Sequence, residues 1–327
     1  MATTFAGSLS EFPNYDVTNH IGTRFYDSKV QLSELVHSEN ADGYILDLAK
    51  LVSERGVVYF TNQNLDIKDQ LALAHRMGVL TGKPADSKLH KHPISEDTPE
   101  LGAEVSVISS MGGIARARNL NGRRASIGWH ADITFERVPS DYAILKMHTI
   151  PKVGGDTLWA CGYEAYDRLS PAMKKFLEGM TAVHNAQFFV DAAQRSGHTI
   201  TDNRGSPENN GRDLTAVHPV IRTHPVTGYK TLFVNKTFTK RIIELTPEES
   251  DTLLDYLYRH ISENHDLQVR YRWEKNDIAI WDNRCTFHTA TNDYDDNRQG
   301  QRAVGIGEKP YFDPASKSRR DVLNITF

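Results

Sequence analysis

The 327-residue chain contains only two cysteines, Cys161 and Cys285. Two thiols cannot build the disulfide framework that stabilises small secreted domains, so the sequence does not indicate that class. Long apolar runs are also absent, and no stretch approaches the roughly 18 apolar residues of a transmembrane helix. Residues 1–15 lack the apolar core of a signal peptide. These features predict a cytoplasmic protein that neither binds nor crosses a membrane.

Positive charge is not in excess either. The chain has 38 Lys and Arg against 42 Asp and Glu, a formal net charge of −4, so it lacks the basic footprint of a nucleic-acid-binding protein. Its apolar fraction of 39% and charged fraction of 24% are typical of globular proteins. Composition therefore predicts a globular protein without a nucleic-acid partner, and it leaves homo-oligomerisation open.

Hydrophobic patterning predicts many short strands and a few helices. Apolar or alternating runs predict strands at 56–60, 105–109, 142–148, 218–222, 229–234, 269–273 and 278–281. Helical spacing or start signals predict helices at 66–77, 163–180 and 246–264. Ser170-Pro171 is a start signal for the second part of 163–180, and a capping box at Thr246 to Glu249 opens the last helix. Residues 194–216 predict a long loop, with a lid as one interpretation. The pattern favours a mainly β fold with peripheral helices, of the double-sheet jelly-roll type.

Two short segments carry the strongest chemical signal. Gly128–Asp132 contains His130 and Asp132, two residues apart, and Trp281–His288 ends in a lone histidine 158 residues after His130. On a strand, residues two apart point to the same face, so His130 and Asp132 could grip one ion. Two imidazoles and one carboxylate form the ligand set of a non-heme Fe(II) site with open coordination positions. We therefore predict that His130, Asp132 and His288 are the metal ligands on which catalysis depends.

Further motifs follow in a fixed order. They are Gly154-Gly155-Asp156-Thr157, Trp281-Asp282-Asn283-Arg284, Asp293-Tyr294, two arginines at 298 and 302, and Gly307 to Tyr311. With Trp129 to Phe135, this set resembles the Fe(II)/2-oxoglutarate dioxygenases similar to taurine dioxygenase, including alkylsulfatase and sulfonate-oxidising relatives. The resemblance covers roughly 56–312. It implies a double-stranded β-helix and a single catalytic domain over 1–327, with a lid or insertion around 160–265.

The resemblance also implies Fe(II), 2-oxoglutarate and O2 as cofactor and co-substrates. The distal carboxylate of 2-oxoglutarate needs a cation in a dry pocket, and a guanidinium binds a carboxylate bidentately. The resemblance places Arg298 in that role, with Thr157 donating a hydroxyl to the same carboxylate. Arg302 is assigned to the primary substrate, but the spacing before the arginines is one residue shorter than the family pattern. Arg302 therefore stays a candidate for both ligands.

The predicted substrate site is carried over from the same resemblance. His92, which precedes a proline, matches the family's sulfonate-contacting histidine, and it would bind an anion together with Arg302. Ser95 and Ser126 stand where taurine-specific enzymes have Tyr and Asn, which puts taurine itself in doubt. Phe188 and Phe189 are expected to wall the pocket, although ordinary core positions fit them as well.

The preferred interpretation is an enzyme that hydroxylates a small anionic compound, with a sulfonate giving sulfite and an aldehyde. The alternative keeps the iron chemistry but acts on an amino acid or biosynthetic intermediate, by hydroxylation, desaturation or ring closure. A third hypothesis, from another class, is a catalytically inactive jelly-roll binding protein, against which the complete ligand set argues.

Overall fold

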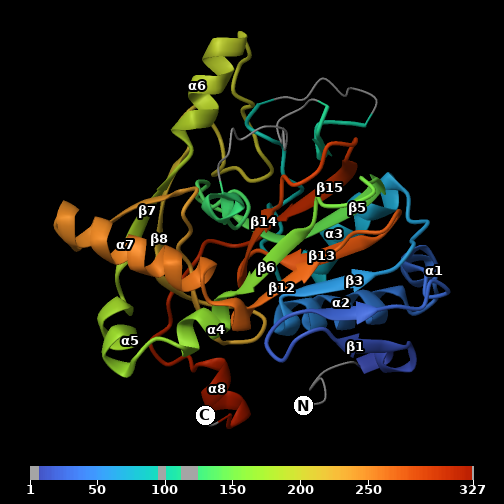
Figure 1. The fold of residues 1–327 in the computed structure, drawn as a ribbon, viewed down its shortest axis with the longest axis horizontal. Coiled ribbons are helices and arrows are strands. Elements are labelled where there is room, and N and C mark those ends of the chain that lie inside the picture. Colours follow the sequence, from blue (N-terminus) through green and yellow to red (C-terminus); the bar gives the residue numbers. More distant parts are fainter. Residues whose placement is uncertain (1–6, 95–100, 112–123, 326–327) are drawn as a thin grey trace.

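The computed structural model describes residues 7–94, 101–111 and 124–325. A seven-stranded sheet forms the centre (Figure 1). Its order is β1 (Asn14–Asp16), β2 (Thr23–Phe25), β3 (Val57–Phe60), β13 (Ile278–Asp282), β5 (Ser140–Thr149), β15 (Gln299–Ile306) and β4 (Val105–Ser109). All neighbours pair antiparallel except β2 and β3, which are parallel. Strands from both ends of the chain therefore meet in one sheet.

Three smaller sheets complete the strand inventory of the described residues. They are β12 (Gln268–Tyr271), β6 (Thr157–Cys161), β14 (Thr286–Ala290); β11 (Thr239–Ile242), β7 (Thr181–Asn185), β8 (Thr215–Pro219); and β10 (Lys230–Leu232), β9 (Ile221–Thr223). The helices are α1 (Leu32–His37), α2 (Ala41–Arg55), α3 (Ile67–Leu80), α4 (Gly162–Asp167), α5 (Pro171–Leu177), α6 (Gln187–Ser196), α7 (Pro247–Ser262) and α8 (Arg319–Leu323). Short 3-10 turns lie at η1 (Gly7–Glu11), η2 (Ala125–Gly128) and η3 (His265–Leu267).

The central strands are buried on both faces, which explains their continuous apolar sequences. Ile144 and Ile280 face the cluster formed with α2 and α3. Tyr59 and Trp281, on the opposite face, pack against Trp159 of the β12-β6-β14 sheet, at ring-centroid distances of 5.6 and 5.8 Å from it. Two sheets thus pack face to face, with helices on the outer side of the larger one.

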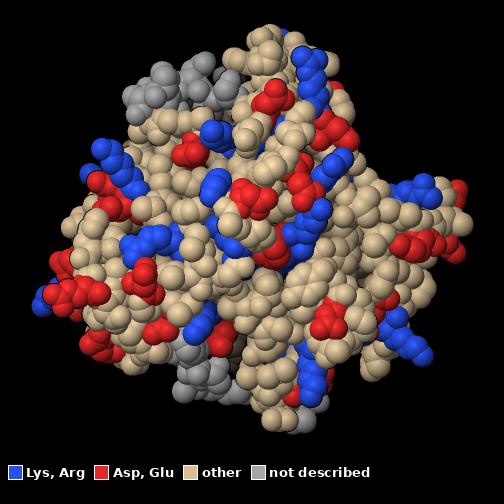
Figure 2. All heavy atoms as spheres, turned by 180° about the vertical axis from the view of Figure 1, so that it is seen from behind, with Lys and Arg blue, Asp and Glu red and all other residues tan. Residues whose placement is uncertain are grey.

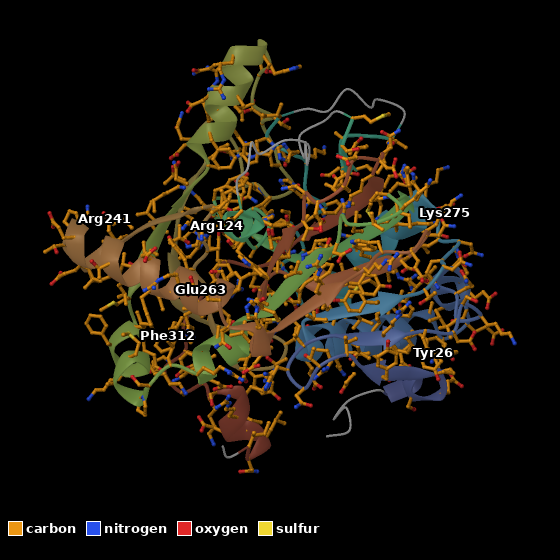
Figure 3. The ribbon with its side chains drawn as sticks, viewed as in Figure 1. Tyr26, Arg124, Arg241, Glu263, Lys275 and Phe312 are labelled. Carbon is orange, nitrogen blue, oxygen red and sulfur yellow. The ribbon has the colours of Figure 1, made fainter. Side chains whose placement is uncertain are left out.

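The segment 162–267 lies between two strands that are hydrogen-bonded neighbours. β6 precedes the segment, β12 follows it, and Gln268 pairs with Ala160. The segment holds α4 to α7 and its own apolar core. In Figure 3 the labelled Arg241 lies on the side of this segment, whereas Tyr26 and Lys275 lie on the side of the large sheet.

Several predicted elements are confirmed and others need correction. The capping box at Thr246 and Glu249 is formed and opens α7. The helical stretch predicted over 163–180 is observed as α4 and α5, and its predicted second start is confirmed, because Ser170 caps α5 with Pro171 in its first turn. The predicted loop 194–216 starts inside α6, which ends at Ser196 and is capped by Gly197 in the left-handed conformation. No pattern indicated α1, α2 or β15.

The loop that follows α6 is tied to the body of the protein. Arg204 is fully buried and forms a salt bridge with Glu136, and it also donates to the carbonyl oxygen of Gly211 at 2.8 Å. Asn209 exchanges two hydrogen bonds with the backbone of Val138. This part of the predicted loop is therefore fixed in place.

The surface shows no large area of a single charge on the face drawn in Figure 2, where acidic and basic side chains are interspersed. This agrees with the net charge of −4. None of the described helices combines the length and the apolar composition needed to span a bilayer.

Candidate metal and 2-oxoglutarate site

Two candidate ligands face each other across a backbone bridge. His130 and His288 form an isolated antiparallel bridge, in which each N–H donates to the other's carbonyl oxygen at 3.0 and 2.7 Å. Directly opposed residues project to the same side, so the imidazoles meet, with ring centroids 4.2 Å apart. The bridge therefore brings together residues that are 158 positions apart in the sequence.

The backbone conformation that brings Asp132 to the two histidines differs from the one that the sequence predicted. Only His130 is bridged, and a turn begins at Asp132, so the expected strand through both residues is wrong. Ile133, the next residue, has φ 50°, an unusual conformation for a β-branched side chain. The carboxylate of Asp132 is therefore directed toward the imidazoles by a turn, and not by the alternation of side chains along a strand.

Three donor atoms converge at this point. The Nε2 atoms of His130 and His288 lie 3.7 and 3.8 Å from Oδ1 of Asp132, and all three atoms lie within 4.8 Å of one another. Ligands that each lie about 2.1 Å from one ion can be at most about 4.2 Å apart, so both measured distances fit a shared ion. Oδ2 of Asp132 is buried and has no hydrogen-bond partner among the described residues. The donor set and the unpaired oxygen fit Fe(II).

Hydrogen bonding and charge prepare these groups for a metal. Nδ1 of His130 lies 2.7 Å from the carbonyl oxygen of Gly128, which can only accept, so Nε2 keeps its lone pair. Burial alone would raise the pKa of Asp132, but Arg302 and His288 hold it well below its usual range. Burial, together with His130, lowers the pKa of His288 well below its usual value. An ionised carboxylate and neutral imidazole are the forms that bind metals.

Arg298 and Thr157 lie together, as the sequence predicted. Arg298 is 3% exposed, donates through Nε to the carbonyl oxygen of Gly155 at 2.9 Å, and reaches Thr157 Oγ1 with Nη2 at 3.4 Å. Trp273 also donates to Thr157 Oγ1, at 2.9 Å, so the hydroxyl hydrogen of Thr157 remains free to donate. Burial lowers the pKa of Arg298, and no described carboxylate forms a salt bridge with it. A buried guanidinium in this state fits an anionic ligand.

Strand pairing connects this basic group to the imidazoles. Thr157 lies on β6 opposite Ala290 of β14, two residues from the pair formed by Trp159 and His288. Paired and alternate residues share a face of the sheet, so Thr157 and His288 point to the same side. The arrangement offers a metal site and a carboxylate site along one sheet surface.

Arg302 contacts one of the candidate metal ligands directly. It is on β15, four residues from Arg298, and its Nη1 donates to Oδ1 of Asp132 at 2.8 Å. Its Nε is buried without a hydrogen-bond partner among the described residues. Arg298 therefore contacts Thr157, whereas Arg302 contacts Asp132. The two arginines have different hydrogen-bond partners.

Aromatic rings connect the predicted substrate residues with His130. His92 packs edge-on against Phe189 at 4.8 Å, Phe189 contacts Phe188 at 4.4 Å, and Phe188 stacks on Phe238 at 5.9 Å. Phe238 lies 6.0 Å from the ring of His130. Burial and then Arg302 lower the pKa of His92 to about 3, so this side chain is neutral at physiological pH.

The remaining predicted residues fall in different places. Ser126 is in η2 and lines a small cavity with Trp129 and Phe287, together with side chains of α7. Ser95 lies outside the described residues. His184 is fully buried, and its Nδ1 lies 3.0 Å from the hydroxyl of Thr134.

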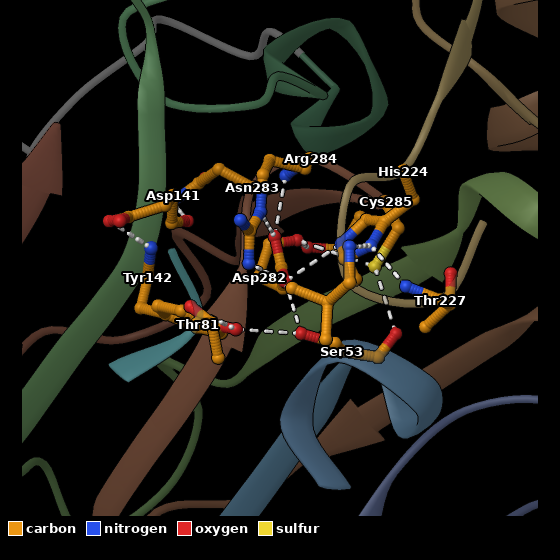
Figure 4. Close-up of polar contacts among 12 residues, drawn as sticks. Ser53, Thr81, Asp141, Tyr142, His224, Thr227, Asp282, Asn283, Arg284 and Cys285 are labelled. Atoms are coloured by element: carbon orange, nitrogen blue, oxygen red, sulfur yellow. Dashed lines mark hydrogen bonds and ion pairs between the residues drawn. The ribbon is translucent and has the colours of Figure 1, made fainter. Parts of the chain in front are cut away.

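A second group of possible metal donors lies nearby. His224, Asp282 and Cys285 are buried together with donor atoms within 4.8 Å of one another. The carboxylate of Asp282 already accepts hydrogen bonds from Arg284, His224 and Ser53 (Figure 4). A cation there would have to displace Arg284, so this group does not fit a metal.

Sequence reasoning missed three residues around the site. Trp273 donates to Thr157, Phe238 contacts His130, and Asn283 accepts the backbone N–H of Asp132 at 3.0 Å. Asn283 was visible as part of the Trp-Asp-Asn-Arg motif, but no role was assigned to it. Trp273 ends a predicted strand, and no local pattern singles out Phe238.

Comparisons with known proteins identify the family. The family model "Taurine catabolism dioxygenase TauD, TfdA family" matches residues 13–304. The chain is 42% identical to the "Alpha-ketoglutarate-dependent dioxygenase oryG" of Aspergillus oryzae, over 97% of this chain and 94% of the relative. It is 33% identical to the "Alpha-ketoglutarate-dependent sulfonate dioxygenase" of Saccharomyces cerevisiae, over 87% of this chain and 65% of the relative.

The fold comparison agrees with the sequence comparisons. A crystal structure of a taurine dioxygenase from Burkholderia xenovorans superposes with a TM-score of 0.70 at 28% identity, covering 93% of this chain and 92% of that chain. The range matched by the family model includes His130, Asp132 and His288. The chain therefore belongs to the TauD, TfdA family and is a 2-oxoglutarate-dependent non-heme iron dioxygenase.

Proposed function

We propose that His130, Asp132 and His288 hold Fe(II), and that Arg298 and Thr157 bind the distal carboxylate of 2-oxoglutarate. The observation that carries this proposal is the convergence of the three donor atoms within 4.8 Å, with one carboxylate oxygen left unpaired. When bound, the iron and 2-oxoglutarate supply the activation of O2. The protein supplies ligation, orientation and the exclusion of water.

The primary substrate is proposed to be a small organic anion, with a sulfonate as the preferred class. Arg302 supports this, because its Nε is buried and unpaired while Nη1 contacts Asp132. His92 is neutral and contributes a polar contact rather than charge. Phe188 and Phe189 would contact the rest of the substrate. The yeast relative, whose name states a sulfonate substrate, favours the same class.

The alternative is the same iron chemistry on an amino acid or biosynthetic intermediate. A carboxylate would suit Arg302 and His92 as well as a sulfonate does. The relative from Aspergillus oryzae, with the higher identity, carries a name that states no substrate. The aromatic chain from Phe189 to Phe238 also supports a substrate with a larger apolar body.

The fold supports a further proposal about architecture. The two face-to-face sheets form a double-stranded β-helix within one catalytic domain over 1–327, and the segment around 160–265 is an insertion that covers the site. Pairing of β6 with β12 across this segment supports the insertion. Helix α6 of this segment contains Phe188 and Phe189, and Phe189 packs against His92 of the proposed substrate site.

An anaerobic titration with Fe(II) and 2-oxoglutarate tests the ligand assignment, because the chelate produces a visible charge-transfer band. We expect the band in the wild type and its absence in His288→Ala. A normal band in His288→Ala would contradict the assignment.

A substrate panel separates the two substrate classes. Sulfite release is measured with taurine, longer alkyl sulfonates and alkyl sulfates, and succinate release with amino acids. Because Ser95 and Ser126 replace the taurine-type residues, we expect taurine not to be the best substrate. A strong preference for taurine would contradict that expectation, and a preference for a neutral compound would exclude the anion site at Arg302.

A further inference from the structure

One side-chain oxygen is connected to two of the three proposed iron ligands. Oδ1 of Asn283 accepts the backbone N–H of Asp132 at 3.0 Å and the indole N–H of Trp281 at 3.0 Å. The ring of Trp281 packs against the imidazole of His288, with centroids 5.1 Å apart. Asn283 is 1% exposed and has no role in the ligand set itself. Its contacts therefore link a carboxylate ligand with an imidazole ligand.

The connection to Asp132 holds a turn that is unfavourable by itself. Ile133 has φ 50°, which lies in the left-handed region that β-branched residues rarely adopt. The peptide groups of Asp132 are fixed on both sides, because Asn283 accepts its N–H and the hydroxyl of Ser140 donates to its carbonyl oxygen at 3.0 Å. Without these two contacts, the turn could relax and carry the carboxylate away from the imidazoles.

Asn283 is itself held in place by hydrogen bonds to the backbone of Asp141. Its backbone N–H donates to the carbonyl oxygen of Asp141 at 2.9 Å, and its Nδ2 donates to the same oxygen at 3.3 Å. Figure 4 shows Asn283 between Asp141 and the polar group around Asp282 and Arg284. The amide thus needs both an acceptor and a donor. An aspartate in its place would turn a carboxylate oxygen toward a carbonyl oxygen.

We propose that Asn283 is a positioning residue that sets the separation between Asp132 and His288 and thereby the affinity of the iron site. The inference rests on the proposed role of these two residues as ligands. Asn283 acts through the backbone of Asp132 and the ring of Trp281, and it contacts neither iron nor substrate. Residues that orient metal ligands in this way typically change metal affinity by about 10–100-fold when they are replaced.

The test compares two buried asparagines whose side-chain amides each accept a backbone N–H and donate to a backbone carbonyl oxygen. Asn209 is also 1% exposed, and it accepts the N–H of Val138 at 3.0 Å and donates to its carbonyl oxygen at 2.7 Å. Asn283→Ala and Asn209→Ala are compared for the Fe(II) dissociation constant, by anaerobic calorimetry, and for the urea unfolding midpoint. We expect both to unfold at lower urea, but only Asn283→Ala to weaken Fe(II) binding, by about 10–100-fold.

A second variant covers the case in which Asn283→Ala does not fold. Trp281→Phe removes the indole N–H and keeps a ring against His288, and we expect a smaller rise in the dissociation constant. Equal Fe(II) affinity in wild type, Asn283→Ala and Trp281→Phe would overturn the inference, as would equal weakening in Asn209→Ala. If the wild type itself bound no Fe(II), the proposed function would fail instead, so the two failures are distinguishable.

Discussion

Two clusters in this protein contain a histidine, an aspartate and a third metal-binding group, yet they differ in how their polar atoms are satisfied. In the His130 cluster (His130, Asp132 and His288), Asp132 keeps one buried oxygen unpaired. In the His224 cluster (His224, Asp282 and Cys285), both oxygens of Asp282 accept hydrogen bonds from neighbouring side chains.

The difference shows that donor type and proximity do not suffice to identify a metal site. Both carboxylates contact an arginine, Asp282 with Arg284 and Asp132 with Arg302. Asp282 has no free oxygen left for a cation, whereas Oδ2 of Asp132 stays free of hydrogen bonds from the described residues. An unpaired buried oxygen carries a cost that a bound ion would remove. Unsatisfied hydrogen-bonding capacity therefore distinguishes the site from the structural cluster.

The largest expected effect is the loss of turnover on removing a ligand of the His130 cluster. Asp132→Ala, like His130→Ala and His288→Ala, should abolish succinate formation and weaken iron binding, because three ligands leave none to spare. Iron content and succinate are measured on the folded variants. His224→Asn is the matched control and should keep one iron per chain. Near wild-type turnover with normal iron in Asp132→Ala would remove the distinction between the clusters.

Asp282→Asn should lower stability instead. It leaves Arg284 buried beside a neutral partner, and breaking a buried ion pair costs about 3–5 kcal/mol. The free energy of unfolding is measured in urea for this variant and for the wild type. A loss below about 1 kcal/mol would show that Arg284 finds other partners and that Asp282 is not the centre of the structural cluster.

Arg298→Ala should chiefly raise the KM for 2-oxoglutarate. Loss of a buried charge-assisted pair costs about 2–5 kcal/mol, which corresponds to roughly thirtyfold or more. Steady-state kinetics with 2-oxoglutarate as the varied substrate measure the change, and Arg302→Ala serves as the comparison because it contacts Asp132 rather than Thr157. The opposite pattern in these two variants would reverse the roles of the arginines.

Glu164→Gln examines another fully satisfied carboxylate through its pH dependence. Burial would raise the pKa of Glu164, but hydrogen bonds from Arg320 and Arg168 outweigh it and lower the pKa to about 2. The folded-state pKa is depressed, so its stabilisation is complete above about pH 4.5 and is lost as the pH falls toward 2.

At pH 7 the Glu164→Gln variant should be less stable by about 2 kcal/mol, and the difference from wild type should shrink below pH 4.5. Urea unfolding at pH 7, 5 and 3 measures this, and iron content should not change. A difference that is independent of pH would show that Glu164 stabilises the fold through packing rather than charge.

The sequence predicted the elements that local patterns specify. Short apolar runs predicted β3 and β13, alternation predicted much of β5, and the capping box at Thr246 predicted the start of α7. The strand β15 was missed, because Gln299 to Arg302 is polar at its start and lacks a clear alternation. Helices α1 and α2 were missed for want of a start signal, and neither N-cap residue makes a capping hydrogen bond.

The sequence by itself determined which residues can form the site. The His-x-Asp motif, a distant histidine and two later arginines can be recognised from their order and spacing alone. Only the tertiary structure decided how they meet. The backbone bridge brings His288 to His130, and a strained turn rather than a strand directs Asp132. Tertiary structure also left Oδ2 of Asp132 without a hydrogen-bond partner among the described residues and satisfied both oxygens of Asp282, because hydrogen-bond satisfaction depends on neighbours that are distant in sequence.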